Sequence, residues 1–127
     1  SITKALEEAG LTTTQIDFIN THGTGTLYND EMEAIAFSRA GLQEVPLNSY
    51  KGYFGHTLGA SGLLETVMSL AFAQEGKLLR CEGFDTLGVS QPLNIITHTQ
   101  EATIKHLLKT ASGFGGSNAA MVLRLMD

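Results

Sequence analysis

The sequence predicts an α/β domain in which a mixed β-sheet is flanked by helices and at least one helix is buried. Two patterns predict this class: short apolar segments that end in glycine-rich turns, and longer segments with helical periodicity between them. The composition agrees, because 43% hydrophobic and 17% charged residues are typical of globular α/β proteins. We therefore expect the 127 residues to form one domain, 1–127, with enough apolar material for a core.

The expected elements alternate between helix and strand, and the chain ends in two strands. In chain order they are a helix (3–9), a strand (16–20), a helix (29–40), a strand (45–50), a long helix (56–74), a short strand (78–81) and two last strands (104–111 and 119–125). Gly10 and Gly41 end the first two helices, because glycine readily adopts the left-handed conformation found at helix C-termini. Asn29 is the expected N-cap of the second helix, with Asp30 and Glu31 in its first turn, where the helix dipole favours carboxylates.

The long helix is the most apolar part of the chain. Segment 56–74 is apolar on nearly every side, which is typical of a buried helix. Its first turns contain only small residues at 59–62, which suggests close approach of another backbone there. Lys51 and His56 lie in a tight glycine-rich turn that we expect at the helix N-terminus. An anion or a developing negative charge is stabilised in such a place.

The last two strands are joined by the glycine-rich turn 113–116, which predicts an antiparallel hairpin. The least periodic segment is 82–100, where glycines and Pro92 indicate loops. The order of elements is therefore β-α-β-α-β-β, with a mixed sheet.

Composition excludes some functions and compartments. The net charge of −5 argues against nucleic acid as a partner. The lone cysteine, Cys81, cannot form an internal disulfide and fits a reducing compartment. The apolar run 58–73 is too short for a membrane span and contains Glu65. We expect a cytoplasmic protein, without a metal site because no metal-ligand spacing occurs.

Three turns contain the unusual chemistry: His22 with its glycines and threonines, segment 51–56, and segment 113–116. All three follow predicted strands of one sheet, at the side where α/β sheets usually bind ligands. Two histidines at strand ends would donate hydrogen bonds to one oxyanion, although each alone is more often structural. His98 and His106 have no motif around them, and we assign both to surface or loop.

Three motifs occur in order along the chain: His22–Gly23–Thr24–Gly25–Thr26 with Asn29, Asp30 and Glu33; Lys51, Gly55–His56, Leu58–Gly59–Ala60 and Gly62 with Glu65; and Gly113–Phe114–Gly115–Gly116 with Asn118 and Ala119. Together they resemble the C-terminal half of the β-ketoacyl-acyl carrier protein synthases, condensing enzymes with a thiolase-like fold. The resemblance covers nearly the whole chain and is weakest over 82–100. It implies one half of a thiolase-like fold and an acyltransferase that condenses an acyl thioester with malonyl-acyl carrier protein, in fatty acid or polyketide biosynthesis.

The resemblance also implies roles for single residues. His22 and His56 match the two active-site histidines, which assist decarboxylation of the malonyl thioester and stabilise the enolate. Lys51 matches the family lysine and Glu65 its carboxylate partner, which help to order the site.

Three further positions concern the substrate. Thr24 and Thr26 match the threonines that bind the phosphopantetheine arm, and Phe114 matches the phenylalanine that gates the nucleophile. No resident cofactor is implied, because phosphopantetheine enters on the carrier protein. The implied partners are the acyl carrier protein, the chain's own N-terminal half and a second subunit in a homodimer or heterodimer.

The chain departs from the family pattern in several places. The family nucleophile is a cysteine in the N-terminal half, which this sequence does not contain, and Cys81 lacks the glycine-rich elbow of that nucleophile. Phe54 replaces a small polar residue, and Ser112 stands where a second phenylalanine is common. The chain starts at Ser1 without a methionine, so we expect a fragment that is inactive alone. A non-catalytic partner subunit of the chain-length-factor type remains the alternative.

Overall fold

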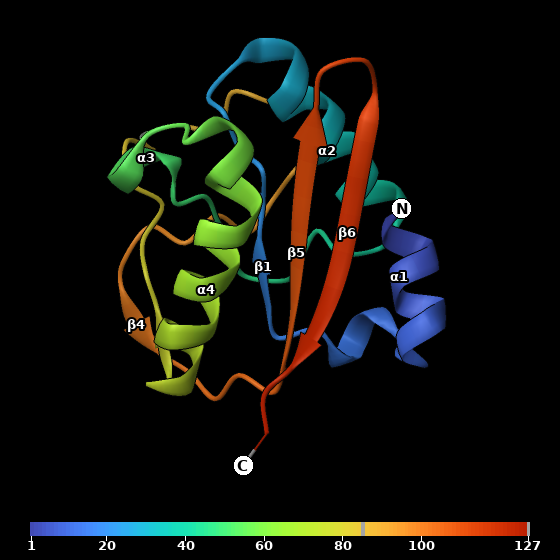
Figure 1. The fold of residues 1–127 in the computed structure, drawn as a ribbon, viewed down its shortest axis with the longest axis vertical. Coiled ribbons are helices and arrows are strands. Elements are labelled where there is room, and N and C mark those ends of the chain that lie inside the picture. The colour runs from blue at the N-terminus through green and yellow to red at the C-terminus, as the bar shows by residue number, and fades with distance from the viewer. Residues whose placement is uncertain (85, 127) are drawn as a thin grey trace.

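The computed structural model describes residues 1–84 and 86–126, which form layers of helices on both faces of a β-sheet (Figure 1). The helices are α1 (Ile2–Ala9), α2 (Leu27–Arg39), α3 (Lys51–Phe54) and α4 (Ser61–Gln74), with 3-10 turns η1 (Thr13–Gln15) and η2 (Leu58–Ala60). The strands are β1 (Phe18–Asn20), β2 (Leu47–Asn48), β3 (Lys77–Leu78), β4 (Gln100–Glu101), β5 (His106–Gly113) and β6 (Ser117–Arg124). The predicted α/β class and the order of the main elements are confirmed.

The main sheet has the strand order β2-β1-β5-β6. Strand β1 pairs in parallel with both β2 and β5, whereas β5 and β6 form the predicted antiparallel hairpin. Strands β3 and β4 make a separate two-stranded antiparallel pair. Because β1, β2 and β5 run in the same direction, the loops that follow them leave from the same edge of the sheet.

Alternate residues of the central strands supply two cores, one on each face of the sheet. Ile19 and Leu108 belong to the core that α1 and α2 complete, and neither is exposed to solvent. Their neighbours Phe18 and Leu107 belong to the core under α4, to which Ala73 contributes. This alternation is the period of two expected of strands covered on both faces.

The expectation of a helix buried on all sides is wrong for this chain. Four residues spaced by one turn face inward from α4: Ser61, Glu65, Ser69 and Ala73. On the outward face Leu63 is 73% exposed and Val67 is 52% exposed. The helix therefore buries a carboxylate and two serines beside Ala73, while two large apolar side chains are exposed, unlike in an ordinary surface helix.

The expected start of the long helix at residue 56 is also wrong. Helix α3 ends at Gly55, whose φ of 74° and ψ of 179° no helix can continue. Leu58 follows in the left-handed region with a φ of 52°, and α4 begins only at Ser61. Lys51 and His56 thus lie in a separate segment before α4, rather than at its N-terminus.

Two smaller expectations are corrected. The N-cap position of α2 is Thr26, so Asn29 lies inside the helix, where its amide donates to Glu33 Oε2. Asp30 is in the first turn as expected, whereas Glu31 accepts hydrogen bonds from Ser90 across the chain. His106 is buried in β5, with Nδ1 3.2 Å from the carbonyl oxygen of Gln15, so its assignment to the surface was wrong.

Candidate active site

The three motif-bearing turns converge as predicted at one edge of the sheet. His22 follows β1, Lys51 follows β2, and the turn after Gly113 follows β5. The turn at Gly23 requires glycine, since its φ is +43° and a Cβ there would lie 2.6 Å from Cβ of Ser49. Close packing of these two loops brings Lys51 beside His22.

His22 is buried and held by Lys51. The ammonium of Lys51 lies 2.5 Å from the carbonyl oxygen of His22 and 3.3 Å from its Nδ1. Because an ammonium only donates, Nδ1 accepts, and the hydrogen-bond network assigns the ring proton to Nε2. Burial, reinforced by the positive charge of Lys51, lowers the pKa of His22 to about 4. His22 is therefore a neutral imidazole at physiological pH, with Nε2–H as a donor.

Lys51 makes the predicted ion pair with Glu65, and a second lysine joins it. Lys51 Nζ lies 2.8 Å from Glu65 Oε2, and both side chains are buried. Lys109 Nζ lies 2.9 Å from Glu65 Oε1, and the Lys109 side chain is only 4% exposed. Sequence analysis missed Lys109, although a lysine inside a predicted buried strand requires a partner. Burial lowers the pKa of Lys109.

Glu33 holds the backbone of the His22 turn. Its Oε1 accepts hydrogen bonds from the backbone N–H of His22 at 3.0 Å and from Thr110 Oγ1 at 2.9 Å. Its Oε2 accepts from the backbone N–H of Gly23 at 2.7 Å. The sequence motif included Glu33 but assigned it no role; the geometry makes it the anchor of this turn.

His56 lies beside His22 but on the exposed side of the site. The two ring centroids are 5.3 Å apart with the planes at 82°. His56 Nδ1 accepts the backbone N–H of Leu58 at 3.0 Å, so in its neutral form this ring also has its proton on Nε2. The chain thus presents two adjacent imidazoles, both with a donor at Nε2.

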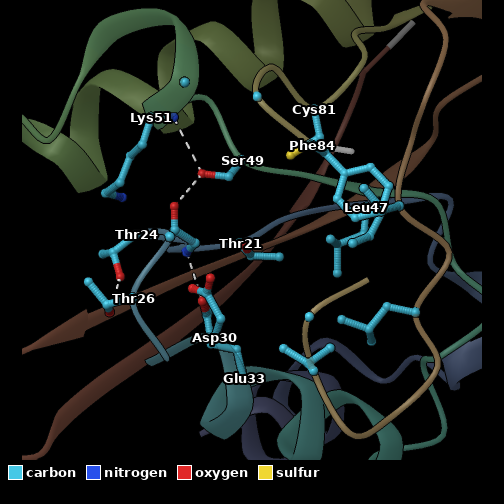
Figure 2. Close-up of a pocket in the computed structure, with 18 of the residues that line it drawn as sticks. Thr21, Thr24, Thr26, Asp30, Glu33, Leu47, Ser49, Lys51, Cys81 and Phe84 are labelled. Atoms are coloured by element: carbon cyan, nitrogen blue, oxygen red, sulfur yellow. Dashed lines mark hydrogen bonds between the residues drawn. The ribbon is translucent and has the colours of Figure 1, made fainter. Parts of the chain in front are cut away.

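A cavity of about 640 Å³ opens next to these groups, between α2, the end of β2 and residues 81–84 and 86–95 (Figure 2). Thr24 and Thr26 line it, and their hydroxyls are 2.7 Å apart. Next to them the Ser49 hydroxyl, labelled in Figure 2, accepts the backbone N–H of Lys51 and donates to the carbonyl oxygen of Gly23. His56 lines this cavity, whereas His22 lines a more open hollow of about 350 Å³ on the other side.

Phe114 and Cys81 lie apart from the histidine pair. Phe114 is at the tip of the β5–β6 hairpin, fully exposed, and lines neither hollow. Cys81 is half-buried in the wall of the larger cavity, and burial raises the pKa of its thiol. A raised pKa reduces the thiolate fraction, which is the opposite of what a nucleophilic cysteine needs.

Two kinds of feature are missing over residues 1–84 and 86–126. No three histidine, cysteine, aspartate or glutamate residues are grouped so that they could hold a metal ion. Within the same residues, no helix is long and apolar enough to cross a membrane.

The chain was compared with known proteins. The family described as beta-ketoacyl synthase, C-terminal domain, matches residues 1–85. The 3-oxoacyl-acyl-carrier-protein synthase 1 of Escherichia coli is 33% identical over 113 residues, which are 87% of this chain and 28% of that protein. The chain therefore spans less than a third of the length of this relative.

Solved structures give the same fold over nearly all of the chain. The ishigamide ketosynthase/chain length factor superposes with a TM-score of 0.93 at 27% identity, over 99% of this chain and 32% of that one. AntDE:AntF, a type II polyketide ketosynthase in complex with its acyl-carrier protein, superposes with a TM-score of 0.92 at 28% identity, over 99% and 32%. The expected thiolase-like half-fold agrees with these neighbours.

Proposed function

This chain belongs to the β-ketoacyl synthase family through that family's C-terminal domain, and from this premise we propose that it is the C-terminal part of a 3-oxoacyl-acyl carrier protein synthase. Such an enzyme condenses an acyl thioester with malonyl-acyl carrier protein, with loss of carbon dioxide, in fatty acid or polyketide biosynthesis. The observation that supports this function most directly is the pair of adjacent imidazoles, with Lys51 behind His22.

The proposed chemistry uses the two histidines as hydrogen-bond donors. When the malonyl carboxylate leaves as carbon dioxide, the electron pair of the broken C–C bond passes to the thioester carbonyl, which becomes an enolate. Nε2–H of His22 and Nε2–H of His56 donate to that oxygen as its negative charge develops. Fixed donors of this kind lower the barrier because they need no reorganisation during the reaction. The enolate carbon then attacks the carbonyl carbon of the acyl thioester; a C–C bond forms, the C–S bond breaks, and the sulfur leaves as a thiolate.

The substrate arm enters along the larger cavity in this proposal. Thr24 and Thr26 offer hydroxyls on its wall, suited to the amides of a phosphopantetheine arm. The arm belongs to an acyl carrier protein, so the chain needs no resident cofactor. A relative of known structure binds its acyl-carrier protein, which supports the same kind of partner here.

The nucleophile is proposed to come from an N-terminal half that covers α4. The raised pKa of Cys81 argues against this thiol as the nucleophile. Cys81 also does not lie in a strand–helix elbow. Outward-facing Leu63 and Val67 leave an apolar surface of the sort that another protein layer buries. The match covers only 28% of the Escherichia coli relative, so the rest of such a protein is long enough to form this layer. A second subunit, identical or related, completes the proposed assembly.

A non-catalytic partner subunit of the chain-length-factor type is the second candidate. One of the similar structures combines a ketosynthase with a chain length factor. The presence of both histidines together with Lys51 favours the catalytic role.

Two half-reactions test the proposal in the full-length polypeptide. His22→Ala and His56→Ala should each slow decarboxylation of malonyl-acyl carrier protein by about 100- to 1000-fold, the usual effect of removing one oxyanion donor. Acylation of the nucleophile should remain near the parental rate. His98→Ala, at an exposed histidine, is the matched control. Parental decarboxylation in either test variant would remove that histidine from the mechanism.

The 127-residue chain alone should neither condense nor become acylated. Incubation with an acyl-thioester donor and intact-mass measurement should show no adduct at Cys81. A stable acyl group on Cys81, or β-ketoacyl product above a protein-free blank, would contradict the need for a second half.

A further inference from the structure

Lys109 is a fully buried lysine on β5 that none of the motifs includes. Its Nζ lies 2.9 Å from Glu65 Oε1, 2.7 Å from the carbonyl oxygen of Thr110 and 3.5 Å from that of Thr21. All three neighbours are acceptors, so the site suits an ammonium group. Burying a lysine is unfavourable unless it is paired and hydrogen-bonded, and Lys109 meets both conditions.

Glu65 is divided between two cations. Its Oε1 faces Lys109 at 2.9 Å, and its Oε2 faces Lys51 at 2.8 Å. Lys51 Nζ also lies 3.2 Å from Oε1, so the two ammonium groups together hold the carboxylate in a single orientation. Lys51 is therefore held at one end by Glu65 and directs its remaining hydrogens to His22.

We propose that Lys109 is a positioning residue for His22. By holding Oε1 of Glu65, it keeps Lys51 directed at His22 Nδ1, so that the ring proton stays on Nε2. Glu65 is the contact through which Lys109 acts on Lys51. The link to decarboxylation rests on the proposed function; the effect on the protonation of His22 does not.

The charges around His22 come from several elements. Lys51 on α3, Lys109 on β5 and His56 each oppose protonation of His22, whereas Glu65 on α4 favours it. Glu33 on α2 directs its oxygens at the backbone N–H groups of His22 and Gly23. One carboxylate thus faces two ammonium groups behind the imidazole.

Titration of His22 tests the proposal without any substrate. The full-length polypeptide is labelled with ¹⁵N- and ¹³C-histidine, and the ring resonances are followed by NMR from pH 3.5 to 8. Lys109→Met, which keeps the length but removes the charge, should raise the His22 midpoint by about one pH unit. Lys109→Arg should keep the midpoint low. Lys105→Met, at an exposed lysine just before β5, is the matched control and should change nothing.

Several outcomes would overturn the proposal. An unchanged His22 midpoint in folded Lys109→Met is one, and an Nδ1–H tautomer of His22 in the parental protein is another. Should Lys109→Met fail to fold, Lys109→Gln retains a donor toward Glu65 and should show the same rise. The parental tautomer is measured in any case, so the test does not depend on one variant.

Kinetics provides the second readout. Lys109→Met should lower kcat for malonyl-thioester decarboxylation at pH 7 by about tenfold with KM unchanged, because Lys51 is no longer held toward His22 Nδ1. A parental kcat in folded Lys109→Met would overturn the positioning role. If the parental protein decarboxylates nothing, the proposed function fails, while the titration still decides the role of Lys109.

Discussion

His22 and His56 lie with their ring centroids 5.3 Å apart, yet their surroundings differ in every respect. His22 is only 6% exposed, and Lys51 and Glu33 hold its side chain and backbone. His56 is exposed and makes one hydrogen bond, to the backbone of Leu58 two residues away. The side of the site behind His22 is therefore complete within this chain, whereas the side at His56 is open.

Helix α4 shows the same difference between an inner and an outer side. Its inner face presents Glu65 to two lysines, and its outer face exposes Leu63 and Val67. A charged cluster is tolerated inside because every member is paired. Apolar side chains outside are stabilising only when something covers them. The inner side of α4 therefore contributes to the stability of this chain, whereas the outer side bears on assembly with another protein layer.

The largest effect should come from removing the shared carboxylate. Glu65→Ala leaves two buried ammonium groups without a counter-charge, and we expect a loss of about 3–5 kcal/mol in the free energy of unfolding. Glu82→Ala removes an exposed ion pair with Arg80 and should cost less than about 1 kcal/mol. Urea denaturation of both variants measures the difference. Equal, small losses would mean that the inner cluster does not stabilise the fold.

A smaller effect is expected at Glu33. Every group that faces its two oxygens is a donor, and each oxygen accepts one backbone N–H. In either orientation of the new amide of Glu33→Gln, its NH₂ group faces a buried backbone N–H. We expect this to lower the free energy of unfolding by about 1–3 kcal/mol.

The control for Glu33→Gln is Glu75→Gln, an exposed carboxylate just after α4. If both glutamines unfold at the parental urea midpoint, Glu33 does not anchor the turn.

The pH dependence of stability tests the environment of His22. His22 has a folded-state pKa of about 4, below the 6.5 of an unfolded histidine. Between these values the unfolded chain binds a proton that the folded chain does not, so stability should decrease as the pH falls from about 6.5 to about 4. Urea midpoints at pH 7, 6 and 5 should fall less steeply in His22→Asn. A parental slope in His22→Asn would contradict the lowered pKa of His22.

The smallest effect is expected at the open side. Phe114 makes no buried contact in this chain, so Phe114→Ala should change the free energy of unfolding by less than about 0.5 kcal/mol. Phe37, which is 1% exposed, is the matched comparison, and Phe37→Ala should cost about 3–5 kcal/mol. A loss above 2 kcal/mol from Phe114→Ala would show that the hairpin tip packs against the rest of the domain.

Much of the site could be predicted from local sequence. Glycine-rich turns after apolar segments located His22, Lys51 and the hairpin, since turn chemistry depends on near neighbours. The Lys51–Glu65 pair was also predicted, because a carboxylate in an apolar helix needs a nearby cation. The start of α4 was not predicted, because the conformations of Gly55 and Leu58 interrupt a sequence pattern that is otherwise helical.

The sequence by itself determined the elements, the edge of the sheet where the turns meet, and the residue types available there. These follow from steric preferences and periodicity, which act over a few residues. Only the tertiary structure decided that Lys109 meets Glu65, 44 positions away, and that Glu33 anchors the turn at His22. It also decided which face of α4 turns inward: the face with Glu65 meets the two lysines, while Leu63 and Val67 are exposed. Such contacts depend on strand register and side-chain direction, which the pairing of distant segments sets.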